Sequence, residues 1–109
     1  MTDDEVKKRA QLQASLDLEL TNSHRITLKQ ALVLPQQIKV IERSVRNGKF
    51  KEQRIDLWLV GQEDSSDGYK VIMRDDGLQF GLASKGFPSD PFLILTAWYG
   101  NLKSTFLSM

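Results

Sequence analysis

A single histidine and no cysteine limit the catalytic chemistry that this 109-residue chain can perform. His24 is the only side chain whose ordinary pKa would let it exchange a proton near neutral pH. No Gly-x-Ser-x-Gly motif marks a serine for it to activate, so we interpret His24 as a surface or capping residue. Without cysteine the chain has no thiolate nucleophile, iron–sulfur cluster or cysteine zinc site. The sequence therefore predicts a protein that is not an enzyme.

Two acidic segments invite a metal-binding or acid–base interpretation. In Glu63–Gly68, aligning Gly68 with the invariant glycine of an EF-hand loop places Arg74 at the twelfth position, where calcium needs a bidentate glutamate. Asp75 and Asp76 precede a glycine, which predicts an exposed hairpin turn whose carboxylates stay ionised. The seven glycines are scattered and form no phosphate-binding loop. We therefore expect solvated turns here, with no metal and no cofactor.

Basic residues concentrate in residues 39–54, which hold six basic and two acidic side chains in a chain whose total charge is +1. Such a segment attracts an acidic protein or the phosphates of a nucleic acid. The near-neutral total and the lack of neighbouring aromatic residues other than Phe50 argue against a dedicated nucleic-acid binder. We predict that Lys39, Arg43 and Arg46 steer an acidic partner.

Trp58 is the side chain most suggestive of an interface. It lies in a strand pattern in which Leu57 and Leu59 share the opposite face, so we expect Trp58 to point away from the main core. Ile72 of the next predicted strand is expected to join it. An apolar second face needs a cover, either a helix of the same chain or a partner, and tryptophan is a common interface anchor. We predict Trp58 and Ile72 as contact residues.

The N-terminal half must position the basic segment. Thr2 and Glu5 form a capping-box pattern that predicts a helix over residues 3–14. Alternating leucines predict a strand over 16–20, whereas 24–34 fits either a short helix capped by Thr27 or the start of a strand. Periodicity after Pro35 favours a helix over 36–47 ending at Asn47-Gly48. The alternative is a hairpin that turns at the same Asn-Gly pair.

The C-terminal half must position Trp58 and Ile72. Alternating patterns predict three strands, at 54–60, 69–74 and 78–83, joined as an antiparallel meander. Asp90 and Pro91 then begin a predicted helix that continues with apolar residues at helical spacing through Phe106. We expect it to cover the face that carries Leu57, Val71 and Phe80. The predicted fold is a single α+β domain over residues 1–109: an antiparallel meander of three to four strands packed against a C-terminal helix, with one or two further helices in the N-terminal half.

The expected function is a small cytoplasmic binding module that acts through protein–protein contact, as a homodimer or with a different protein. An adaptor or a toxin-neutralising immunity-type protein is one concrete form. The acidic start followed by basic residues is unlike a secretory signal, and the longest apolar run, Phe92 to Tyr99, is too short to span a membrane. The alternatives are a nucleic-acid binder that uses the 39–54 segment and a small-ligand protein with a pocket between sheet and helix.

Overall fold

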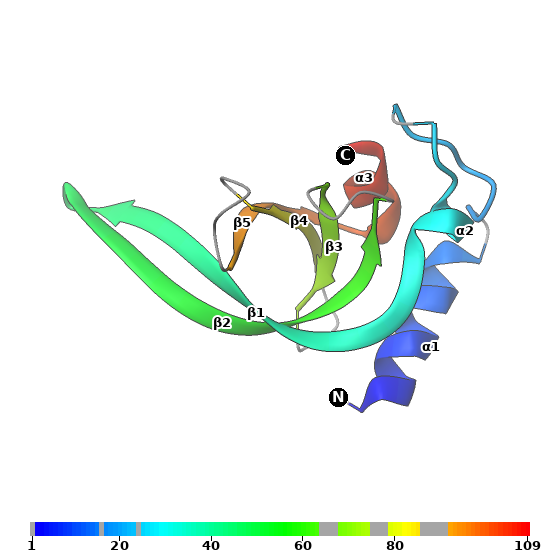
Figure 1. Cartoon of the computed structure of the whole chain (residues 1–109), viewed down its shortest axis with the longest axis horizontal. Helices are drawn as coiled ribbons and strands as arrows, with labels where there is room; N and C mark the ends of the chain where they lie inside the picture. Colours follow the sequence, from blue (N-terminus) through cyan, green and yellow to red (C-terminus); the bar gives the residue numbers. More distant parts are fainter. Residues whose placement is uncertain (1, 16, 24, 64–67, 75–78, 86–91) are drawn as a thin grey trace.

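The computed structural model describes residues 2–15, 17–23, 25–63, 68–74, 79–85 and 92–109. Within these ranges, five strands form a closed barrel and three helices lie along one side of it (Figure 1). The strands are β1 (Leu32–Arg46), β2 (Lys49–Gln62), β3 (Lys70–Met73), β4 (Phe80–Ser84) and β5 (Leu93–Gly100). The helices are α1 (Asp3–Ala14), α2 (Leu28–Ala31) and α3 (Leu102–Leu107).

The barrel is a meander closed by its first and last strands. Successive strands from β1 to β5 pair antiparallel. Because each pairing reverses the chain, β5 runs in the same direction as β1, and Val40 and Ile41 pair in parallel with Leu93 and Ile94. The predicted α+β class is confirmed, but the sheet closes into a barrel and is not a meander with two open edges. Closure pairs backbone groups that the outermost strands of an open sheet would expose.

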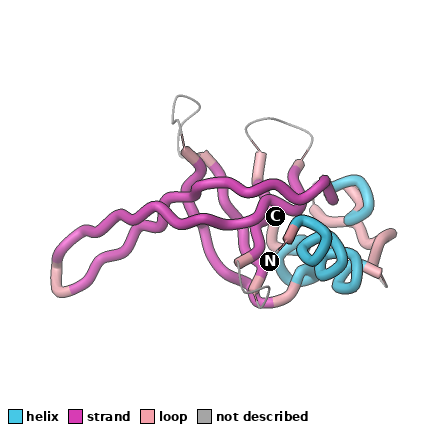
Figure 2. Tube along the Cα trace, turned by 90° about the horizontal axis from the view of Figure 1, so that it is seen from below, coloured by secondary structure: helices cyan, strands magenta, loops and turns pink. Residues whose placement is uncertain are grey.

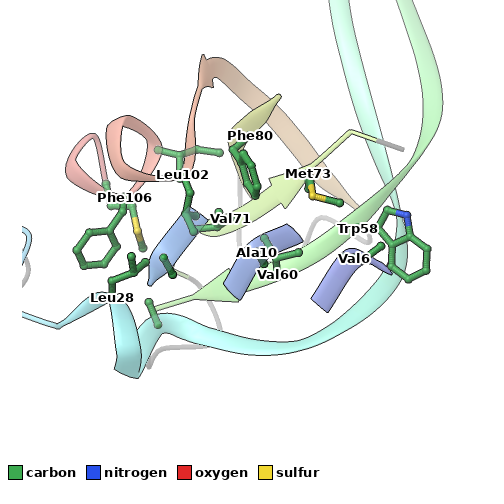
Figure 3. Close-up of a cluster of buried hydrophobic side chains, with 14 residues drawn as sticks. Val6, Ala10, Leu28, Trp58, Val60, Val71, Met73, Phe80, Leu102 and Phe106 are labelled. Carbon is green, nitrogen blue, oxygen red and sulfur yellow. The ribbon is translucent and has the colours of Figure 1, made fainter. Parts of the chain in front are cut away.

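The two faces of the strands build two apolar layers. The barrel interior is filled by residues from all five strands, among them Val40, Leu57, Ile72, Ala83 and Trp98. The outer face of β2, β3 and β4 packs against the helices and forms a second layer (Figure 3). Its members include Val6, Ala10, Leu28, Trp58, Val60, Val71, Met73, Phe80, Leu102 and Phe106. Helices therefore cover one side of the barrel and leave the other strands to solvent.

Gly81 makes room for Trp98 inside the barrel. The two residues face each other across β4 and β5. A Cβ atom at Gly81 would lie 2.6 Å from the Ala97 carbonyl oxygen and 2.8 Å from the Trp98 ring. Both distances are too short for any side chain, so glycine is required for the indole to pack at this point.

Helix α1 has the bounds that the capping pattern predicts. The Thr2 hydroxyl accepts a hydrogen bond from the Glu5 amide at 3.3 Å. The buried residues Val6, Ala10 and Ala14 recur every four positions and form one face. Two of them are alanines, whose small side chains let the helix axis approach the barrel closely. Leu12 stays 71% exposed and does not contribute to the core.

The predicted helix over 36–47 is wrong, and the alternative hairpin is correct. This segment belongs to β1, which pairs with β2 from Arg46↔Lys49 inward. Asn47 and Gly48 both have positive φ, +52° and +72°, as the two central residues of a type I′ turn require. The β-branched residues of this segment, such as Ile38 and Val40, also favour an extended backbone.

The predicted C-terminal helix is correct only at its end. Residues 93–100 form β5, and the helix α3 begins after Asn101, whose side chain accepts a hydrogen bond from the Ser104 amide at 2.7 Å. Gly100 has a φ of +85°, which separates strand from helix. The predicted start at Asp90 and Pro91 lies outside the described residues. Val71 and Phe80 do lie under α3 and α1, whereas Leu57 points into the barrel.

The segment between α1 and β1 also differs from the expectation. The predicted strand over 16–20 is wrong in its described part: residues 17–19 form a turn, and Leu18 and Leu20 pack against the outer layer. Their carbonyl oxygens accept hydrogen bonds from the amides of Lys29 and Leu28. Thr27 caps α2 as one of the two alternatives proposed, and the chain becomes extended at Leu32. The three strands predicted at 54–60, 69–74 and 78–83 are confirmed as β2, β3 and β4 with shifted ends.

Candidate interaction site on the β1–β2 arm

The outer half of the β1–β2 hairpin projects beyond the barrel. Val40 and Ile41 are the last β1 residues paired with β5, and β2 first pairs with β3 at Trp58. Residues 42–46 and 49–53 therefore pair only with each other among the described residues, and we call residues 42–53 the arm. Figures 1 and 2 show it extending away from the barrel and the helices, and it accounts for much of the molecule's 43 Å length.

Two of the three predicted steering cations are neutralised across the hairpin. Lys39 lies 3.6 Å from the carboxylate of Asp56, and Arg43 donates to Glu52 at 2.9 Å. Both pairs are exposed, so each is worth little stability, but each lowers the charge available to a partner. The backbone of Arg46 faces Lys49 beside the turn. The basic residues that remain available to a partner therefore lie nearer the end of the arm.

The arm ends in an exposed apolar pair that basic residues flank along the chain. Val45 and Phe50 face each other across the two strands, with 68% and 63% of their surface exposed. Residues 44–51 include three basic residues and no acidic residue. Lys49 and Lys51 make no ion pair within the described ranges. A large exposed apolar pair at the end of a projecting element is typical of a contact surface.

Trp58 and Ile72 do not form a surface. Trp58 is 3% exposed and packs in the outer layer, with its ring drawn beside Val6 of α1 in Figure 3. Ile72 is fully buried inside the barrel. The register places Trp58 opposite Met73 and Leu59 opposite Ile72, so the expectation that Trp58 and Ile72 share a face is wrong. A helix of the same chain covers Trp58, but it is α1 and not the segment 36–47.

A cavity of about 600 Å³ lies where the arm joins the barrel. Its lining includes Glu42, Gln53, Leu57, Arg74 and Trp98. Packed side chains fill most of the interface between sheet and helices, and a smaller cavity of about 280 Å³ lies between α1 and the start of β1. In the described ranges, no group of three acidic or histidine side chains is placed to hold a metal ion. Residues 64–67 and 75–78, which contain most of the acidic segments, lie outside those ranges.

Comparison of the chain with family models, with curated proteins and with solved structures finds no match. No helix in the described part of the chain has the length and apolar character needed to cross a membrane.

The sequence itself contains a pattern that predicts the arm tip, and this pattern is independent of the number of basic residues. Asn47-Gly48 between alternating residues is a strong hairpin signal, and in that hairpin Val45 and Phe50 must face each other. A hairpin also places Lys39 and Arg43 opposite acidic residues, whereas a helix would have placed them in an unpaired stripe. The secondary structure thus decides which residues are available for contact.

Proposed function

We propose that this protein is a non-enzymatic binding module that contacts an acidic partner protein through the end of its β1–β2 arm. The observation that supports the proposal most strongly is the exposed Val45–Phe50 pair on one face of the arm, with Lys49 and Lys51 on the other face. An exposed aromatic anchor on an element that also carries steering charges is a common arrangement at transient interfaces. The lysines would accelerate encounter with an acidic surface, and burial of the apolar pair would provide the affinity.

The barrel and helices serve the arm as a rigid base in this proposal. The arm strands continue into β1 and β2 of the barrel, where Val40 and Trp58 are buried. An element fixed in this way loses little conformational entropy on binding. We keep the cytoplasm as the proposed compartment, since the cysteine-free composition suits a reducing environment.

Affinity capture with matched variants tests the proposal. Immobilised wild-type protein and the double variant Val45→Ser/Phe50→Ser are exposed to host extract, with Leu12→Ser as the control because Leu12 is equally exposed but lies on α1. We expect a partner that the wild-type protein and the Leu12→Ser protein retain and the double variant loses. Retention by all three proteins would contradict the proposal.

A nucleic-acid partner is the second candidate, favoured by the three basic residues and the exposed Phe50 at the arm tip. Each phosphate contact steepens the loss of affinity with salt. With Lys39 and Arg43 already paired, few contacts remain, so we rank this candidate below a protein. Retention of single- or double-stranded oligonucleotides at low salt, lost steeply at physiological salt and in Lys49→Gln/Lys51→Gln, would support it over an acidic protein.

A further inference from the structure

We infer that the free edge of β2 along the arm accepts an extended acidic segment of the partner as an additional strand. This inference rests on the proposed function, and it specifies how the partner is held. The two strands of the arm pair with each other, and within the described ranges β2 has no second neighbour before Trp58. One edge of β2 therefore exposes a row of backbone amides and carbonyls, which is the requirement for strand addition.

The hairpin register identifies the backbone groups on that edge. In a two-residue hairpin the residues that flank the turn, here Arg46 and Lys49, exchange hydrogen bonds with each other. The pattern alternates along the ladder, so Phe50, Glu52 and Arg54 direct their amides and carbonyls away from β1. The β3 pairing at Trp58 follows the same alternation, because Trp58 is again an even-numbered residue of β2. An added strand would thus continue the line of β3.

Charge decides which segment fits this edge. Glu52 and Asp56 are already paired with Arg43 and Lys39 of β1, so the remaining charges on β2 are those of Lys49, Lys51 and Arg54. The Arg54 guanidinium lies over the Phe92 ring at 4.4 Å, so its side chain is held toward β1 and β5 while its backbone stays on the edge. Three cations in the six residues from Lys49 to Arg54 favour an acidic strand and oppose pairing with the same edge of a second copy.

The alternation of β2 predicts a sequence pattern for the bound segment. Lys49 and Lys51 share one face of the arm, and Phe50 lies on the other face with Val45. A strand beside β2 places alternate side chains next to each face. Acidic side chains would therefore lie beside the lysines and apolar side chains beside Phe50. The expected pattern is an acidic residue at every second position with apolar residues between.

Peptide binding to the full-length chain tests this inference. The probe is an eight-residue peptide of alternating glutamate and valine, and its control is an isomer with the same residues in Glu-Glu-Val-Val order. A second control carries N-methyl groups on the amides of one edge, which removes main-chain hydrogen bonds and keeps every side chain. We expect the alternating peptide to bind at least about tenfold more tightly than either control.

Two substitutions of Arg54 distinguish the contribution of backbone hydrogen bonds to peptide binding from that of charge. Arg54→Pro removes an outward amide without removing a hydrogen bond of the hairpin, whereas Arg54→Ala removes the charge and keeps the amide. We expect Arg54→Pro to weaken peptide binding about tenfold relative to Arg54→Ala. Slower amide exchange at Glu52 and Arg54 on peptide binding, measured by NMR in the wild-type protein, supports the same conclusion and does not depend on how either variant folds.

Three results would overturn the inference. They are equal binding of the alternating peptide and its controls, unchanged amide exchange at the β2 edge, and a concentration-dependent dimer in sedimentation that the peptide does not dissociate. Each would leave the proposed function standing if Val45→Ser/Phe50→Ser still loses the captured partner. The proposed function fails separately, when that double variant retains the partner as well as the wild-type protein does.

Discussion

Replacement of Trp58 by alanine tests whether this residue stabilises the fold or contacts a partner protein. Trp58 is 3% exposed and packs among Val6, Met73 and Phe80 in the outer layer. Truncation of a buried tryptophan removes its contacts and leaves a cavity, which costs about 3–5 kcal/mol. A domain of this size has a free energy of unfolding of about 5–15 kcal/mol, so the variant should lose a large share of its stability.

Urea unfolding followed by far-ultraviolet circular dichroism measures this loss, since Trp98 would complicate a fluorescence signal. With a slope of about 1–3 kcal/mol per molar urea, the midpoint of Trp58→Ala should fall by about 2 M. Phe50→Ser is the control: Phe50 is 63% exposed, so its midpoint should stay within the equivalent of about 0.5 kcal/mol. Equal midpoints for the two variants would refute the burial of Trp58 and with it the packing of α1 on β2.

Three further substitutions test the barrel, the arm and the C-terminal helix. Gly81→Ala should lower the free energy of unfolding by about 3 kcal/mol in a thermal or urea scan, because its Cβ would clash with the Ala97 carbonyl and with Trp98; a neutral effect would contradict the close approach of β4 and β5. A double-mutant cycle on Arg43 and Glu52 should give a coupling below about 1 kcal/mol that disappears in 1 M salt, and a larger, salt-resistant coupling would show that this pair is not solvent-exposed. Asn101→Ala should cost about 1 kcal/mol through loss of the α3 cap, measured as a shift in melting temperature, whereas Asn101→Asp should retain most of the stability.

Local sequence signals predicted the elements that have one dominant pattern. The capping residues Thr2 and Glu5 located α1, and strict alternation located β2, β3 and β4. These signals succeed because the relevant contacts lie within a few residues along the chain. Asn47-Gly48 was compatible with both a helix end and a hairpin turn, and the neighbouring β-branched residues carried the information that decides between them.

The sequence predicts a helix where residues 93–100 form a strand, because the apolar residues of this segment are frequent enough to fit both a helical and a strand period. Leu93 and Leu95 face the barrel interior, whereas Tyr99 packs against the outer layer, so β5 is partly buried on both faces. Such a strand shows no clear alternation. Barrel closure depends on the parallel pairing of β5 with β1, more than 50 residues apart along the chain, and no local signal reports a contact of that kind.

The structure changes which of the predicted contact residues are available to a partner. The basic segment 39–54 does contain the arm, but Lys39 and Arg43 have cross-strand partners. Trp58 and Ile72 are buried, since β3 and the barrel part of β2 are covered on both faces, one by the barrel interior and one by helices. The exposed pair of Val45 and Phe50 follows only once the hairpin register is known.

Site-specific photo-cross-linking from the arm tip is the most direct test of the account. A photoreactive phenylalanine derivative is placed in full-length protein at the position of Phe50, and at the position of Leu107 on α3 as the control. Both side chains are exposed, but α3, which carries Leu107, packs on the barrel away from the arm (Figure 1). We predict a cross-linked acidic partner protein from the Phe50 position and none from the Leu107 position, with the product reduced by added salt. Cross-linking from Leu107 alone, or equally from both positions, would contradict the assignment of the arm as the binding element.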